Sequence, residues 1–216
     1  MIKTSASLLA CDLSNISGEL SRCKAAGVDW IHFDVMDGAF VEQITYGSPV
    51  LKCVRKATDM FLDVHLMVND PMSQIKFFAE AGADLISFHL ESSSSAVQTL
   101  ELIRSFGVKS ALAIKPGTAA EEVYPLLSLC DMVLVMTVEP GYGGQAFIPE
   151  TIEKIRQLRE YAGGDLDIEV DGGINAKTAP LVKEAGANVL VAGTGLFKAE
   201  DMEQANAALK TPQKGA

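Results

Sequence analysis

The chain of 216 residues is short of positive charge, because it has 18 Lys and Arg residues against 28 Asp and Glu residues and a formal net charge of −10 at pH 7. Nucleic acids and anionic membranes are bound by basic patches or stripes, which this composition does not favour. The sequence therefore argues against both kinds of partner. A phosphate group that binds this protein must be held locally by a few hydrogen-bond donors.

The sequence also lacks the features of membrane proteins and of secreted, disulfide-rich proteins. It has no run of 18 or more apolar residues and no long apolar segment near its N-terminus, so we expect a cytoplasmic protein. None of its cysteines has CxxC spacing, and we expect all of them to be reduced and to have packing roles. These cysteines are Cys11, Cys23, Cys53 and Cys130.

The chain does contain a repeated alternation of strand-like and helical segments. Short Ala-Gly motifs at 26–29, 81–84 and 185–188 each close a helical pattern and open an apolar run. The predicted strands lie near residues 4–9, 30–35, 61–67, 85–89, 110–114, 132–137, 166–170 and 189–192. The predicted helices lie near residues 13–26, 49–56, 71–81, 94–106, 119–129, 149–161, 177–185 and 201–209.

Eight such alternations predict an α/β fold of the (β/α)₈ or TIM barrel type. We expect a single domain over residues 1–216, with a frayed tail at 211–216. A doubly wound open sheet is the alternative, but it would not need eight units, and no GxGxxG motif follows the first predicted strand. In a barrel, function is found at the C-terminal ends of the strands.

Unusual polar residues gather at those strand ends. The second strand carries His32 and Asp34 on one face, the third ends near His65, and the seventh ends at Asp171. One buried polar residue alone is usually structural, satisfied by a neighbour. Two imidazoles and two carboxylates from three strand ends instead favour a divalent metal site for Zn²⁺, Fe²⁺, Mn²⁺ or Co²⁺.

Three further polar residues of these strands have less prominent predicted roles. Asp63 and Glu169 lie two residues before His65 and Asp171, so we expect them one layer deeper, in hydrogen bonds rather than as ligands. His89 ends the fourth strand, and nothing in the sequence pairs it with the ligand set.

Glycine-rich segments follow the last three predicted strands. In barrels, the loops after strands seven and eight commonly bind phosphate through backbone N–H groups, although such glycines can also simply permit tight turns. Three adjacent loops favour a phosphorylated ligand. The candidate contacts in them are Gly141, Tyr142, Gly143, Gly144, Gly172, Gly173, Gly193 and Thr194.

Sulfur-containing side chains stand near the same strand ends. Met36, Met67 and Met136 are either core filler or an apolar lining beside a reaction intermediate. Ser7, in the first strand, either reaches into the site or bonds a neighbouring backbone group.

These motifs closely resemble those of the ribulose-phosphate 3-epimerase family over nearly the whole chain. The resemblance rests on Ser7–Leu9, Ile31–Gly38, Leu62–Met67, Val135–Gln145 and Glu169–Asn175. It implies a barrel that interconverts D-ribulose 5-phosphate and D-xylulose 5-phosphate with one divalent metal ion and no organic cofactor. It also implies a small sugar phosphate as partner, and we expect a homo-oligomer.

Carried over to this chain, the resemblance makes His32, Asp34, His65 and Asp171 the metal ligands and Asp34 and Asp171 the acid/base pair. Ser7 and His65 become substrate contacts, and the phosphate is expected on Gly143, Gly144, Gly173, Gly193 and Thr194. The chain departs from the family pattern at Ala39-Phe40-Val41-Glu42-Gln43, where members typically read His-Phe-Val-Pro-Asn, and at Thr194-Gly195, where Ser-Ala is common.

The implied reaction needs two opposed acid/base groups to invert a carbon next to a ketone, and a metal ion to stabilise the enediolate. Three rival functions remain open: 3-epimerisation of a ketohexose 6-phosphate such as D-allulose 6-phosphate, non-catalytic sugar-phosphate sensing, and aldolase or decarboxylase chemistry with Lys115 as the lysine.

Overall fold

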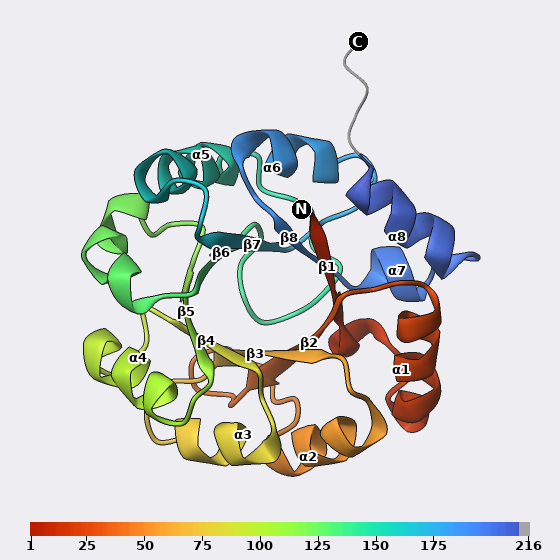
Figure 1. Ribbon diagram of the computed structural model, residues 1–216, viewed down its shortest axis with the longest axis horizontal. Helices are drawn as coiled ribbons and strands as arrows, with labels where there is room; N and C mark the ends of the chain where they lie inside the picture. The colour runs from red at the N-terminus through yellow and green to blue at the C-terminus, as the bar shows by residue number, and fades with distance from the viewer. Residues whose placement is uncertain (212–216) are drawn as a thin grey trace.

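The computed structural model describes residues 1–211, and its strands close into one parallel barrel in sequence order, with helices around it (Figure 1). The predicted (β/α)₈ architecture is confirmed, and all eight predicted strands are present within a few residues of the expected bounds. They are β1 (Lys3–Ser7), β2 (Trp30–Met36), β3 (Phe61–Met67), β4 (Leu85–His89), β5 (Lys109–Ile114), β6 (Met132–Met136), β7 (Asp167–Asp171) and β8 (Val189–Ala192).

The outer layer consists of α-helices and short 3₁₀ helices. The α-helices are α1 (Ile16–Ala25), α2 (Ser48–Ala57), α3 (Ile75–Ala81), α4 (Ala96–Ser105), α5 (Thr151–Ala162), α6 (Ala179–Ala185), α7 (Thr194–Phe197) and α8 (Met202–Lys210). The 3₁₀ helices are η1 (Leu8–Ala10), η2 (Leu13–Asn15), η3 (Ala120–Glu122) and η4 (Tyr124–Leu129).

The structure corrects the sequence prediction after β5. The helix expected over 119–129 is two 3₁₀ helices, η3 and η4, because Pro125 has no N–H to donate to the preceding turn and its ring obstructs an α-helix there. The short helix α7 was not predicted, since Thr194 and Gly195 were interpreted as part of a glycine turn. Of the tail expected to be frayed, Thr211 is exposed after α8, and 212–216 lie outside the described residues.

Most outward residues of the strands are apolar, and the inner faces are more varied. In β2, Ile31, Phe33 and Val35 belong to the large core cluster that packs the barrel against the helices. The alternate residues of β2 therefore point inward. At the N-terminal end of the barrel the inward residues form a separate apolar cluster of Trp30, Leu85, Ala111, Met132 and Val189. This cluster fills one end of the barrel interior, so an interior pocket can open only toward the other end.

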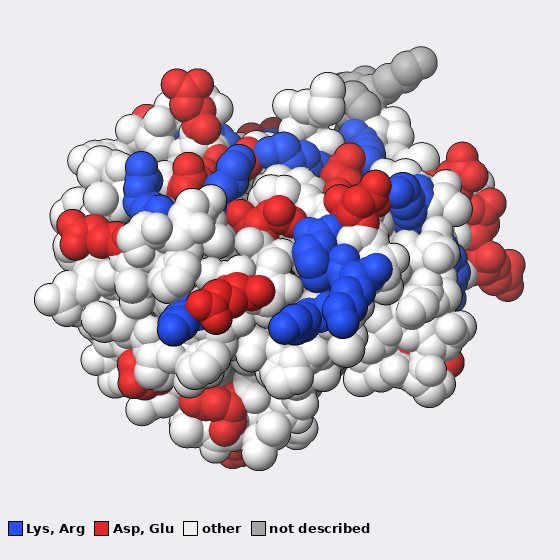
Figure 2. Space-filling view, turned by 60° about the horizontal axis from the view of Figure 1, so that its bottom comes forward, with Lys and Arg blue, Asp and Glu red and all other residues white. Residues whose placement is uncertain are grey.

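No helix among residues 1–211 is long and apolar enough to cross a membrane. On the face seen in Figure 2, several basic side chains gather near the centre, and others lie among acidic and uncharged ones.

Candidate active site and metal centre

Four side chains from three strands converge inside the C-terminal half of the barrel. His32 Nε2 lies 3.2 Å from Asp34 Oδ1 and 3.9 Å from Asp171 Oδ2, and His65 Nδ1 lies 3.3 Å from Asp34 Oδ1. One ligand atom from each of these four residues lies within 4.8 Å of the others. The strand register explains the convergence, because Asp34 pairs with His65 across β2 and β3.

The chemistry of this cluster fits a divalent metal ion. His32 and His65 are fully buried, and His32 Nε2 has no well-aligned hydrogen-bond partner among residues 1–211. A buried nitrogen lone pair aimed between two carboxylates is costly unless a proton or a cation occupies the space. Two imidazole nitrogens and two carboxylate oxygens can hold a metal ion here.

The layer below the cluster is also polar, as the sequence predicted for Asp63 and Glu169. Asp63 Oδ2 lies 2.6 Å from His32 Nδ1 and accepts a hydrogen bond from the Ser5 hydroxyl at 3.1 Å. Burial, and then the charge of Asp63, raise the pKa of Glu169 well above its ordinary range. Burial also acts to raise the pKa of Asp63, but His32 outweighs it and the pKa is lowered. An ionised Asp63 therefore holds the proton of His32 on Nδ1, and Nε2 is the nitrogen left to face the cluster.

Asp34 and Asp171 have pKa values that are shifted in opposite directions. Burial alone would raise the pKa of Asp34, but the charge of His32 and hydrogen bonds from His32 and His65 lower it below its ordinary range. Burial, and then the negative charge of Asp34, raise the pKa of Asp171 to about 6. Two carboxyl groups whose pKa values are separated by their surroundings suit the roles of base and acid.

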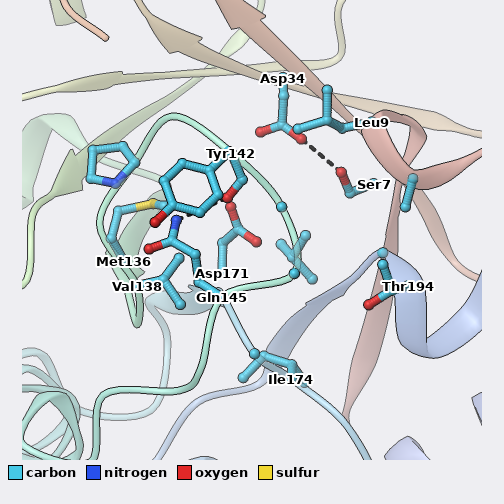
Figure 3. Close-up of a pocket in the computed structure, with 18 of the residues that line it drawn as sticks. Ser7, Leu9, Asp34, Met136, Val138, Tyr142, Gln145, Asp171, Ile174 and Thr194 are labelled. Atoms are coloured by element: carbon cyan, nitrogen blue, oxygen red, sulfur yellow. Dashed lines mark hydrogen bonds between the residues drawn. The ribbon is translucent and has the colours of Figure 1, made fainter. Parts of the chain in front are cut away.

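Both carboxyl groups reach a pocket of about 550 Å³ at the C-terminal end of the barrel. Figure 3 shows Asp34 and Asp171 directed into this pocket from different sides, with the Ser7 hydroxyl donating to Asp34 Oδ2 at 2.7 Å. Ser7 therefore reaches the site rather than bonding backbone. Fourteen of the predicted site residues line the pocket: Ser7, Asp34, Met36, Met67, Met136, Gly141, Tyr142, Gly143, Gly144, Asp171, Gly172, Gly173, Gly193 and Thr194.

The glycine loops are shaped by close backbone contacts. Gly173 has φ of +66°, and a Cβ atom there would lie 2.7 Å from the backbone nitrogen of Phe147. Any other residue at this position would push apart the loops after β6 and β7. The loop after β6 lies across the barrel opening (Figure 1), so its packing against Gly173 shapes one wall of the pocket.

Comparisons with known proteins agree with this geometry. The model of the ribulose-phosphate 3 epimerase family matches residues 3–197. The chain is 42% identical to the cytoplasmic isoform of ribulose-phosphate 3-epimerase from Oryza sativa subsp. japonica, over 99% of this chain and 95% of that protein. It is 44% identical to ribulose-phosphate 3-epimerase from Bacillus subtilis, over 95% of this chain and 96% of that protein.

The chain belongs to the ribulose-phosphate 3-epimerase family.

Among solved structures, the 3-hexulose-6-phosphate synthase from Salmonella typhimurium has a similar fold. Its TM-score is 0.67 at 17% sequence identity, and the match covers 96% of each chain. At this identity the likeness concerns the fold alone. The family of this chain is therefore shown by its sequence relatives, and the wider set of barrels adds only the architecture.

The segment that departs from the family pattern has an inner and an outer side. Phe40 and Val41, which follow the pattern, pack against Met36 and Met67. Ala39, Glu42 and Gln43, which depart from it, are exposed and do not line the 550 Å³ pocket. These three departures therefore lie outside the pocket walls, whereas Thr194 and Gly195, the other departure, line the pocket.

Two features of the site were missed or undervalued in the sequence. His89 faces inward, with Nε2 lying 3.0 Å from His65 Nε2, although no spacing in the sequence paired the two residues. The inward alternation of Ser87 and His89 in β4 was the available signal. Lys198, directly after α7, also lines the pocket, and its nearness to Gly195 in the sequence could have indicated it. Lys115, the candidate for lysine chemistry, does not line this pocket.

Proposed function

We propose that this protein catalyses the interconversion of D-ribulose 5-phosphate and D-xylulose 5-phosphate by proton transfer at C3. The observation that carries the proposal is the meeting of Asp34 and Asp171 in one pocket, beside two buried imidazoles and below the glycine loops. Inversion of a carbon next to a ketone needs one group to remove a proton and another to return one to the opposite face. The two aspartates, from β2 and β7, fill these roles.

The two carboxylate oxygens of Asp34 have different neighbours, which suggests one for metal binding and the other for proton transfer. Its Oδ1 is the oxygen near His32 and His65, at 3.2 and 3.3 Å. Its Oδ2 accepts the hydrogen bond from Ser7, and both residues line the pocket. We therefore assign metal binding to Oδ1 and proton transfer to Oδ2, with the Ser7 hydroxyl holding the carboxylate in position. Asp171 carries the second proton, and the roles of the two aspartates exchange in the reverse reaction.

His32, Asp34, His65 and Asp171 are the proposed ligands of one divalent ion, chosen from Zn²⁺, Fe²⁺, Mn²⁺ and Co²⁺. When bound, such an ion supplies Lewis-acid stabilisation of the negative charge that develops on the substrate oxygens. The imidazoles of His32 and His65 and the carboxyl groups of Asp63 and Glu169 are all fully buried, so they would exclude water from that side of the site when an ion is bound. No organic cofactor is part of the proposal.

The phosphate is proposed to lie against the loops after β6, β7 and β8. The backbone N–H groups of Gly143, Gly144, Gly173, Gly193 and Thr194 are the proposed donors, and Met36, Met67 and Met136 line the pocket nearer the reacting carbon. Hydrogen bonds to the phosphate provide binding energy remote from the reacting carbon, and this binding energy orients C3 between the two carboxyl groups.

We also keep a cytoplasmic location, a single domain and a homo-oligomer as predictions.

The proposal is tested by comparing kcat/KM on two sugars after loading with each of the four metal ions. We expect turnover of D-ribulose 5-phosphate, with kcat/KM at least about tenfold above that of D-allulose 6-phosphate, because an extra carbon must be accommodated in the pocket. The reverse preference would assign the ketohexose phosphate instead. Tight binding of both sugars without turnover under every metal would identify a sensor.

A further inference from the structure

His65 has a hydrogen-bond partner on the side away from the proposed metal. Its Nδ1 faces Asp34, and its Nε2 lies 3.0 Å from Nε2 of His89, the last residue of β4. Both histidines are fully buried. Two ring nitrogens at this distance share one proton, so one of them must donate it and the other must accept it.

Glu91 determines the direction of this hydrogen bond. Its Oε2 lies 3.1 Å from His89 Nδ1, while its Oε1 accepts hydrogen bonds from the backbone N–H of Lys115, at 2.8 Å, and from the Thr118 hydroxyl. A carboxylate can only accept, so the proton of a neutral His89 lies on Nδ1. Nε2 of His89 is then an acceptor, and the shared proton must belong to Nε2 of His65. A neutral His65 with its proton on Nε2 has a free lone pair on Nδ1.

We propose that Glu91 and His89 are positioning residues that set the tautomer of His65, so that its Nδ1 can bind the divalent metal ion. The inference rests on the proposed function, because it needs a metal ion held by the four ligands named above. Both proposed histidine ligands are then oriented by a carboxylate. A carboxylate orients His32 directly, through Asp63, and a carboxylate orients His65 through the intervening ring of His89.

Phe40, which lies in the segment 39–43 and follows the family pattern there, covers the pair of His65 and His89. The Phe40 ring packs against His89 with centroids 4.8 Å apart, and Lys115 Nζ lies 4.1 Å from the centroid of the same Phe40 ring. These contacts cover the histidine pair and keep it in surroundings of low dielectric constant. In such surroundings the direction of a hydrogen bond has a larger energetic effect than it has in water.

The decisive variant is Glu91→Gln, which keeps the shape of the side chain. Since Lys115 and Thr118 both donate to Oε1, the carbonyl oxygen of the glutamine takes that place and its NH₂ group faces His89 Nδ1. The amide donates where the carboxylate accepted, so the chain of hydrogen bonds reverses and the proton of His65 moves to Nδ1. We expect the Kd for Zn²⁺ to rise about 10–100-fold.

The matched control is Glu122→Gln, which removes the same charge from a carboxylate that accepts from the Ala119 N–H and does not contact His89. Zinc affinity is measured by competition with a chromophoric chelator, and we expect this control to stay within about threefold of wild type because exposed charges have small effects. Wild-type zinc binding tests the proposed metal centre, whereas the ratio between the two variants tests the inference. Equal Kd values for both variants would overturn the tautomer role.

A second measurement does not depend on the stability of any variant. Two-bond ¹H–¹⁵N NMR spectra of metal-free wild-type protein report which nitrogen of each imidazole carries the proton. At pH 8 we expect the proton on Nε2 of His65 and on Nδ1 of His89. A proton on Nδ1 of His65 in the wild-type protein would contradict the inference, even if Glu91→Gln bound zinc poorly.

Discussion

Replacing Asp34 by asparagine separates the catalytic role of this residue from its structural one. Asparagine has almost the same shape, and its carbonyl oxygen can still accept the hydrogen bond that Ser7 donates to Oδ2 at 2.7 Å. The variant loses the negative charge beside His32 and His65, and it loses the carboxylate that we propose removes the C3 proton. We therefore expect the barrel to fold and turnover to disappear.

The size of the effect follows from the two tasks assigned to Asp34. Loss of a general acid or base usually lowers a rate by about 10²–10⁴-fold, and weaker metal binding adds to that loss. We expect kcat to fall at least about 10³-fold, which corresponds to about 4 kcal/mol in the activation free energy. The loss should persist at saturating metal, because added metal does not restore the base.

Asp63→Asn is the control for this experiment. Asp63 is equally buried and lies 2.6 Å from His32 Nδ1, but it does not line the pocket. Its replacement should weaken metal binding about 10–100-fold. Excess metal should then restore most of the wild-type kcat. The assay follows xylulose 5-phosphate formation while the metal is titrated. An Asp34→Asn enzyme that kept more than a tenth of wild-type kcat, or an Asp63→Asn enzyme that excess metal did not rescue, would refute this division of roles.

Three other predictions concern the pocket and the buried histidines. Lys198→Gln should raise KM about threefold at low salt and leave kcat unchanged, because an exposed cation attracts the substrate phosphate only weakly. The effect on KM should be smaller at high salt, since salt screens this attraction. An effect on kcat alone would exclude this role of Lys198. Gly173→Ala should lower kcat/KM at least about tenfold through its contact with Phe147. Gly117→Ala, which lies outside the pocket and whose Cβ would meet nothing within 4 Å, should change kcat/KM less than about threefold. Equal losses would argue against the close-packing explanation. Burial lowers the pKa of His89 from 6.5 to about 4, so the stability gained by keeping it neutral is fully present above pH 6.5 and is lost as the pH falls toward 4. The unfolding free energy of metal-free His89→Gln should therefore decrease less steeply than that of wild type over this pH range, as measured by urea denaturation; parallel curves would contradict the shift.

Much of the fold could be predicted because the two faces of each strand have different compositions. Outward residues such as Ile31, Phe33 and Val35 pack against helices, so polar residues between them had to face the interior. Placing His32 and Asp34 inside a barrel is energetically costly unless they have a partner, and for this reason they could be predicted as candidate metal ligands. The same alternation indicated Asp63 and Glu169 as a deeper layer. These predictions needed only local sequence periodicity and the general rule that barrel sites lie at the C-terminal strand ends.

The remaining features depend on three-dimensional contacts that periodicity does not encode. The contact between His65 and His89 depends on which ring nitrogens face each other across β3 and β4. The close approach of Gly173 to Phe147 joins two loops from different strands. The helix predicted over 119–129 was wrong because Pro125 lies within this apolar pattern, and its missing N–H favours 3₁₀ turns there.

We propose above that two aspartates beside a divalent metal ion exchange the proton at C3 of a pentulose phosphate. The most direct measurement is the ¹H NMR spectrum of D-ribulose 5-phosphate incubated in D₂O with the metal-loaded protein. We predict that xylulose 5-phosphate forms with deuterium at C3, and that Asp34→Asn gives neither the product nor the exchange. Metal-loaded wild-type protein that left both the C3 proton and the sugar unchanged would show that the protein does not catalyse this epimerisation.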